Sequence, residues 1–293
     1  MQTRTGNLPI GFRRLRFSPW QRDLSALITW AKAHDFPFID LGPDADAEGR
    51  QVVDAGLGIG SADLPDWNSL IAADAGRRRA AVEKSAAYMQ TCSKMGVNNF
   101  FMVMLPDKPE APRTENFSLM VDSLNALSPT LDQLSAHLVI EGWPGPGALC
   151  CTPESVRAMM KACPSPNVGL NYDPSHLLRM GIDPLRFLEE FVPRVYHFHG
   201  KDTELLPEAF YEFGTEQPPT WASPHHFGGL TWRYTIPGHG CFRWVRAIEI
   251  LMAHGYHTRG GRISIELEDE HFNGSEEGER RGLLASASYL ASC

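Results

Sequence analysis

Four side chains that can bind a divalent metal ion stand at the ends of short apolar runs in the second half of the chain. They are Glu141 after LVI, Asp173 after VGLNY, His199 in VYHFHG and Glu266 after ISI. Three carboxylates and one imidazole form a hard, oxygen-rich donor set that suits Mn²⁺, Mg²⁺ or Co²⁺ better than a structural zinc ion. A single acidic residue at such a position is more often a helix cap or a solvated residue. The recurrence at four consecutive runs therefore predicts a metal site.

Two positions in this set have a neighbour of the same type. His197 precedes His199 by two residues, across Phe198, so one of the two histidines points inward and the other points outward or into the next layer. Glu266 and Glu268 lie on the same face of a strand, and only the register of that strand decides between them. The residues alone leave both choices open.

Eight strand candidates, most of them followed by a helical pattern, run along the chain. The strand candidates are Pro9–Arg13, Phe36–Leu41, Val52–Ile59, Phe100–Leu105, Leu138–Glu141, Val168–Tyr172, Val195–Phe198 and Ile263–Glu266. This alternation favours a (β/α)8 TIM barrel and a single domain over residues 1–293. The carboxyl ends of barrel strands meet on one rim, so residues as distant in sequence as Glu141 and Glu266 can share one ion. We also expect Pro129 to kink or break a helix.

The segment 203–232 interrupts this alternation. It is rich in proline, glycine and aromatic residues, and it follows the seventh strand candidate. A loop of about 30 residues inside a domain is unusual and is often functional. We therefore expect an insertion that acts as an active-site lid.

The composition argues against several classes of partner. The formal net charge is −8, and the one tight basic run, Arg77–Arg79, is expected to be a solvated helix face. No apolar window reaches the ~18 residues of a membrane span, and the N-terminal residues lack the pattern of a signal peptide. The six cysteines are too scattered for a disulfide framework. These features predict a soluble, cytoplasmic protein that binds neither nucleic acid nor membranes.

The motifs around the four side chains resemble the xylose isomerase-like family of sugar isomerases and epimerases. They are Glu141 after LVI, DPSH at 173–176, HFHGKD at 197–202 and ISIELED at 263–269. The likeness extends from about residue 10 to residue 290 and is strongest after residue 138. The family also includes ketose 3-epimerases and, more distantly, endonuclease IV-type nucleases. The resemblance implies a TIM barrel.

The resemblance also implies a set of metal ligands. One divalent ion, Mn²⁺ before Mg²⁺ or Co²⁺, would be bound by Glu141, Asp173, His199 and Glu266. The family pattern favours His199 over His197, because the ligand immediately precedes x-Lys-Asp, and it favours Glu266 over Glu268. In the ketose epimerases of the family the two glutamates also move the proton, from opposite faces of the substrate.

Further roles follow from the same resemblance. His176 is expected either to contact a substrate oxygen or to support the metal site. Lys201 either holds a developing oxyanion or pairs with Asp202. Trp143 could stack on a sugar face. The candidates for substrate binding are His176, Trp143, Arg233 and His239.

The implied function is a metal-dependent sugar isomerase or epimerase that abstracts a proton next to a carbonyl. The alternative is a lyase or hydrolase that expels the aglycone of a 3-keto-glycoside from the same metal site. An endonuclease IV-like nuclease and a non-catalytic subunit are less favoured. Ketose epimerases tend to carry an arginine a few residues after the ligand histidine. The matching region here, Thr203–Leu206, contains no arginine, so the resemblance does not identify the substrate. We expect a small sugar or sugar derivative as partner, and a homodimer or homotetramer.

Overall fold

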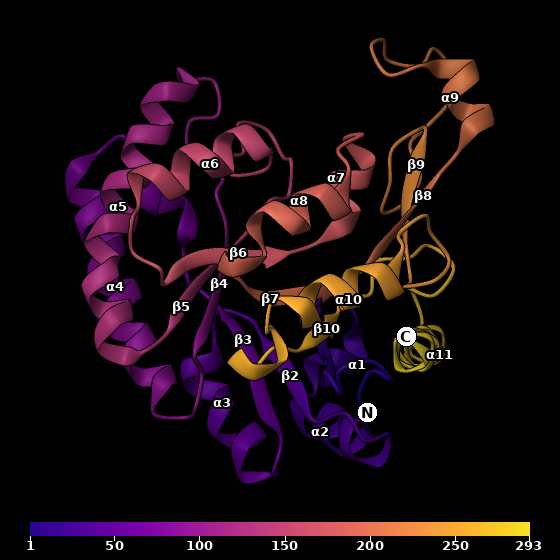
Figure 1. Ribbon diagram of the computed structural model, residues 1–293, viewed down its shortest axis with the longest axis horizontal. Helices are drawn as coiled ribbons and strands as arrows, with labels where there is room; N and C mark the ends of the chain where they lie inside the picture. The colour runs from indigo at the N-terminus through magenta and orange to yellow at the C-terminus, as the bar shows by residue number, and fades with distance from the viewer.

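A closed barrel of eight parallel strands forms the centre of the protein (Figure 1). The structure is a computed structural model that describes residues 1–293. The barrel strands are β1 (Ile10–Arg13), β2 (Phe38–Leu41), β3 (Gly58–Asp63), β4 (Asn99–Val103), β5 (His137–Glu141), β6 (Val168–Tyr172), β7 (Val195–Gly200) and β10 (Ile263–Ile265). Strand β10 pairs with both β7 and β1 and closes the barrel. The predicted TIM barrel is confirmed.

The helices of the chain lie around the outside of the barrel, apart from α9 (Pro207–Phe213), which lies in a segment that projects from it (Figure 1). They are α1 (Pro19–Arg22), α2 (Leu24–Ala33), α3 (Ala45–Asp54), α4 (Ala75–Ser93), α5 (Arg113–Leu134), α6 (Pro153–Ala162), α7 (Pro174–Arg179), α8 (Pro184–Phe191), α9 (Pro207–Phe213), α10 (Trp244–Ala253) and α11 (Glu276–Ser292), with 3₁₀ turns η1 (Trp67–Ile71), η2 (Val192–Arg194) and η3 (His257–Arg259). None of these helices combines the length and the apolar character needed to cross a membrane. Helix α5 continues through Pro129, so the expected break does not occur.

The third strand differs from its predicted position. Val52 and Val53 belong to helix α3, which the sequence patterns did not reveal, and the strand begins only at Gly58. Gly56, with φ +84°, lies between the two elements in a conformation that favours glycine at helix ends. The prediction was wrong because a short run of small and apolar residues fits a buried helix as well as a buried strand. The corrected strand ends at Asp63.

Buried polar side chains gather inside the barrel, where apolar side chains usually fill the interior. Most of the core is apolar and forms one continuous cluster. The exceptions on or directly after barrel strands include Asp40, Ser61, Asp63, Asn99, Glu141, Asn171, Asp173, His197, His199, Lys201, Ser264 and Glu266. Burying so many polar groups is costly unless each has a partner. Their concentration makes this part of the barrel the candidate functional site.

The segment after β7 forms an arm that we define as residues 202–235. Strands β8 (Asp202–Leu205) and β9 (Trp232–Thr235) pair antiparallel, and α9 lies between them. The arm projects from the barrel beside α7, and α9, at its outer part, has no buried residue (Figure 1). The expected structureless loop is therefore a hairpin with a short helix. Its role as a lid remains a prediction.

Candidate active site

Three carboxylates and one imidazole meet at the carboxyl ends of four neighbouring barrel strands. Glu141 ends β5, Asp173 follows β6, His199 lies in β7 and Glu266 follows β10. The Nδ1 atom of His199 lies 2.7 Å from Glu141 Oε2, 3.5 Å from Glu266 Oε2 and 4.0 Å from Asp173 Oδ2. All four side chains are buried. The structure thus brings together the four side chains that the sequence singled out, here called the carboxylate cluster.

The two carboxylate oxygens of Asp173 have different roles, one in the fold and one in the carboxylate cluster. Its Oδ1 accepts hydrogen bonds from the backbone N–H of Ser175 at 2.9 Å and from the Ser175 hydroxyl at 2.6 Å, which caps helix α7. Its Oδ2 is buried without a hydrogen-bond partner. One carboxylate therefore starts a helix and still presents an oxygen to the site.

His176 contacts the cluster from the other side. Its Nε2 lies 3.3 Å from Glu141 Oε1 and 3.3 Å from Asp173 Oδ2, while its Nδ1 is 2.7 Å from the hydroxyl of Tyr234 on β9. Ligand atoms of His176 and the three carboxylates all lie within 4.8 Å of one another. Both expected roles of His176, substrate contact and support of the metal site, suit this position.

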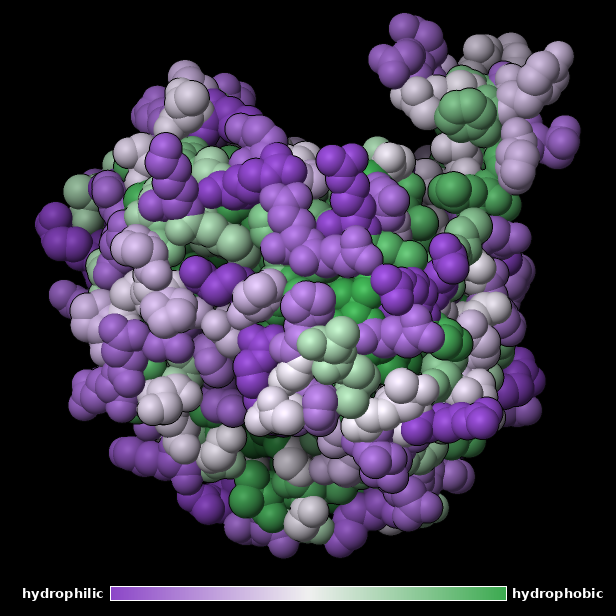
Figure 2. All heavy atoms as spheres, in the orientation of Figure 1, coloured by the Kyte–Doolittle hydropathy of each residue, from purple (hydrophilic) through white to green (hydrophobic).

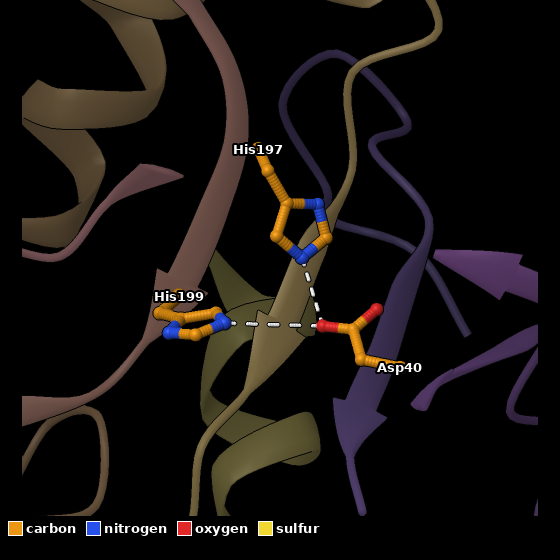
Figure 3. A group of neighbouring side chains, drawn as sticks. All are labelled: Asp40, His197 and His199. Carbon is orange, nitrogen blue, oxygen red and sulfur yellow. Dashed lines mark hydrogen bonds and ion pairs between the residues drawn. The ribbon is translucent and has the colours of Figure 1, made fainter. Parts of the chain in front are cut away.

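Asp40 on β2 lies between the two histidines of β7 (Figure 3). Its Oδ2 is 2.8 Å from His197 Nε2 and 3.9 Å from His199 Nε2. Both histidines point into the barrel, and His197 lies one layer deeper. Burial lowers the pKa of His197, and the nearby Asp40 offsets only part of this effect. His197 is therefore engaged with Asp40, whereas His199 turns its Nδ1 to the carboxylate cluster.

Lys201 provides a buried positive charge at the cluster. Its Nζ lies 3.2 Å from Asp173 Oδ2 and 3.0 Å from Glu268 Oε2, and it also forms an ion pair with Glu266. Burial alone would lower the pKa of Lys201, but Asp173 and Glu266 raise it well above its ordinary value. Glu268 is partly exposed and reaches only Lys201, so Glu266 is the glutamate within the cluster.

Asp202 has a structural role and does not pair with Lys201. Its carboxylate accepts hydrogen bonds from Trp244 Nε1 at 2.8 Å and from the backbone N–H groups of Thr203 at 2.8 Å and Phe242 at 3.0 Å. These contacts join the start of the arm to the start of α10. The Lys201–Asp202 pairing considered from the sequence is therefore not formed.

The charged neighbours keep both glutamates ionised. Burial raises the pKa of Glu141, but His199 and His176 outweigh burial and hold this pKa well below its usual range. Burial likewise raises the pKa of Glu266, and Lys201 and His199 lower it below its ordinary value. In turn, burial lowers the pKa of His199, whereas Glu266 and Glu141 raise it to about 10. Without a metal ion, the cluster therefore holds a protonated His199 and two carboxylates in their basic form.

Besides Asp40 and Tyr234, three more residues of the site, Arg13, Asp63 and Asn171, were not identified from the sequence. Arg13, which ends β1, forms a two-pronged ion pair with Asp63 at 2.6 and 2.8 Å, and its Nε lies 3.2 Å from Glu266 Oε1. Asn171 donates a hydrogen bond from Nδ2 to Glu141 Oε2 at 2.6 Å. Arg13 and Asp63 end their strands as Glu141 ends β5, so the strand-end criterion could have found both.

Not all predicted substrate-binding residues lie near the cluster. Trp143 follows β5, and its ring lies 5.8 Å from the guanidinium of Arg179. Arg233 occupies the opposite face of β9 from Tyr234 and pairs with Glu204, Nε to Oε2, at 2.7 Å. His239 is exposed. Arg233 and His239 are therefore not brought to the carboxylate cluster.

The donor set fits one divalent cation. Asp173 Oδ2, His176 Nε2 and His199 Nδ1 are buried, and each lies close to another charged side chain of the cluster without forming a well-oriented hydrogen bond. Such groups are costly to bury unless they have a ligand. Carboxylate oxygens together with imidazole nitrogens suit Mn²⁺ or a similar ion.

The comparisons with known proteins define the family. Residues 22–293 match the model of the xylose isomerase-like TIM barrel family, and the chain belongs to this family. The uncharacterized protein YfiH of Bacillus subtilis (strain 168) is 32% identical over 123 residues, which cover 41% of this chain and 37% of YfiH. The inosose dehydratase of Geobacillus thermodenitrificans (strain NG80-2) is 27% identical over 164 residues, which cover 56% of this chain and 51% of the enzyme. The match thus spans about half or less of the length of these relatives.

A solved structure supports the same fold. The 3-keto-D-glucoside 4-epimerase YcjR from E. coli superposes with a TM-score of 0.70 at 14% sequence identity, over 98% of this chain and 100% of the epimerase chain. At this identity the likeness concerns the fold alone. The chain thus shares its fold with a sugar epimerase and part of its sequence with an inosose dehydratase.

Proposed function

We propose that the protein is a divalent-metal-dependent sugar isomerase or epimerase that removes a proton from the carbon next to a carbonyl group. The observation that carries this proposal is the convergence of Glu141 and Glu266 on His199, beside Asp173. These four residues would hold the ion, with Mn²⁺ preferred and Mg²⁺ or Co²⁺ as alternatives. Bound there, the ion would act as a Lewis acid that stabilises negative charge on the substrate's carbonyl oxygen.

The side chains of the protein supply the proton transfer. Glu141 and Glu266 come from strands β5 and β10, which lie on opposite sides of β7 in the barrel, so we expect them to address opposite faces of a small substrate. Their lowered pKa values keep them in the form that accepts a proton. Lys201 is positioned to stabilise an oxyanion beside Glu266, because its charge is buried and fixed in place. His176, held by Tyr234, is positioned to contact a substrate hydroxyl.

A second candidate function uses the same first step. After the α-proton is removed, a leaving group on the next carbon can depart, which gives a lyase acting on a keto-sugar or a 3-keto-glycoside. The inosose dehydratase relative favours this reaction type. The arm favours it too, because Tyr234 contacts His176 and the neighbouring Trp232 lines a cavity that offers space for part of a substrate larger than a free ketose.

Incubation with Mn²⁺ in D₂O distinguishes the two candidates. An isomerase or epimerase incorporates deuterium next to the carbonyl of a free ketose, without loss of any substituent. A lyase releases the aglycone from a 3-keto-glucoside and leaves free ketoses unlabelled. Absence of exchange and of release across both substrate classes contradicts proton abstraction.

A matched pair of variants connects the activity to the cluster. We expect Glu266→Gln to lower the rate at least about a hundredfold, since it removes a basic carboxylate at the reacting carbon. Glu268→Gln serves as the control, since Glu268 reaches only Lys201 and lies outside the cluster. Equal rates in the two variants contradict the role given to Glu266.

A further inference from the structure

A cavity of about 570 Å³ lies between the arm and the end of helix α7. Its apolar wall is formed by Leu178, Met180, Leu205, Leu206, Phe210 and Trp232. Two of these side chains remain largely exposed, Leu205 at 43% and Phe210 at 57%. Hydrophobic side chains are visible where the arm joins the body of the molecule (Figure 2). The volume is within the range typical of small-molecule sites.

Arg179, the last residue of α7, places an unneutralised positive charge in the wall of this cavity. Its guanidinium lies 4.6 Å from the ring centroid of Trp232, 5.4 Å from that of Tyr234 and 5.8 Å from that of Trp143. Aromatic rings hold a cation in place but do not cancel its charge. The guanidinium forms no ion pair with a carboxylate of the protein. Its N–H donors are thus free for an oxygen of a ligand.

Two aromatic side chains link the cavity to the carboxylate cluster: Trp232, which lines the cavity, and Tyr234, which contacts His176. The rings of Trp232 and Tyr234 pack with centroids 4.9 Å apart. The Tyr234 hydroxyl lies 2.7 Å from His176 Nδ1, and Lys201 Nζ is 4.5 Å from the Tyr234 ring. Arg179 therefore lies in the cavity wall next to the tyrosine that contacts His176.

We propose that this cavity binds an aromatic substituent joined through oxygen to a keto-sugar, with the Arg179 guanidinium contacting the linking oxygen. The inference rests on the proposed function for the sugar half of the substrate. Apolar and aromatic walls favour a flat apolar group over a second, strongly hydrated sugar. A cation at the junction favours an oxygen that carries or develops negative charge. The substrate class is thus an aryl keto-glycoside.

The test uses 4-nitrophenol as a probe of the cavity, because its neutral and ionised forms differ in absorbance. Titration into the full-length protein, with and without Mn²⁺, gives the affinity for each form. We expect the phenolate to bind about tenfold more tightly than the phenol, which lowers the pKa of the bound dye by about one unit. Arg179→Met should abolish the preference, and Leu205→Trp should block binding by filling the cavity.

Val245→Trp provides the matched control, because Val245 is an exposed residue of α10 and does not line the cavity. It should bind the dye as the unsubstituted protein does. Equal affinity for the two forms of the dye overturns the proposal, as does unchanged binding in Arg179→Met or Leu205→Trp. Dye binding requires no turnover. Failure of the proton-exchange assay would therefore contradict the proposed function without changing the conclusion drawn from dye binding.

Discussion

Individual atoms of the cluster have distinct partners. One oxygen of Asp173 caps α7, and the other is turned to the site. One nitrogen of His199 approaches Asp40, and the other approaches Glu141. Stacking of the His199 ring on Phe101, with centroids 5.4 Å apart, restrains its orientation. This division of atoms was outside the reach of the sequence, because it depends on side-chain geometry across strands that are distant in the chain.

The two histidines of the site should differ in their effect on metal binding. We expect His199→Gln to weaken Mn²⁺ binding by at least about a hundredfold. Replacing a residue that only supports the ligands usually weakens metal binding by less than this. His176→Gln should weaken Mn²⁺ binding less, by about tenfold, and lower the rate of proton exchange, because His176 would act on the substrate. Isothermal titration calorimetry gives both affinities. A larger loss of Mn²⁺ affinity in His176→Gln than in His199→Gln would indicate that His176, and not His199, is the ligand.

Lys201 should stabilise the metal-free protein. We expect Lys201→Met to lower the free energy of unfolding by about 3 kcal/mol or more, since it leaves Asp173 and Glu266 as buried carboxylates without their closest cation. Added Mn²⁺ should reduce the deficit by supplying positive charge. Urea denaturation measures both effects, with the exposed Lys84→Met as control. A deficit below about 1 kcal/mol would contradict this role.

At the scale of the elements, the ends of the predicted strands were the features that located most of the site residues. The strands that deliver Glu141, Asp173, His199 and Glu266 were located because apolar runs end at each of them. The predicted third strand ended at Ile59, so Asp63, which ends the actual strand, was not recognised as a strand-end residue. Arg13 was overlooked because an arginine at a strand end resembles an ordinary solvated residue until its partner is known.

His137 at the start of β5 should make stability depend on pH. Its ring stacks on Tyr196 of β7 at 3.8 Å, and burial, followed by the nearby Arg259, lowers its pKa from 6.5 to about 4. The folded state thus binds a proton less readily than the unfolded chain does. The stability gained from neutral His137 is fully present above pH 6.5 and is lost as the pH falls towards 4.

Replacing this histidine isolates its contribution. Allowing for its partial exposure, we expect the unfolding free energy of the unsubstituted protein to fall by about 1–2 kcal/mol more than that of His137→Phe between pH 7 and pH 4.5. Urea denaturation in EDTA at several pH values, which keeps metal binding out of the comparison, measures the difference. Parallel pH profiles for the two proteins would show that His137 does not titrate in this way.

At the scale of the whole molecule, the barrel was predictable and the arm was not. Alternating strand and helix patterns leave few folds other than a TIM barrel. The arm lacks such periodicity, and its pairing of β8 with β9 spans a long intervening segment that includes α9. Its inner face, with Trp232 and Tyr234, borders the site, whereas Arg233 points to the other face. The arm is therefore the part of the molecule that we expect to decide the substrate.

Calorimetric titration of the metal-free protein with Mn²⁺ tests the central claim most directly. We predict one ion per chain in the unsubstituted protein and in Glu268→Gln. In Glu141→Gln we predict a loss of affinity of about a hundredfold or more, since a ligand is removed. A stoichiometry well below one ion per chain in correctly folded protein, or unchanged affinity in Glu141→Gln, would contradict the account.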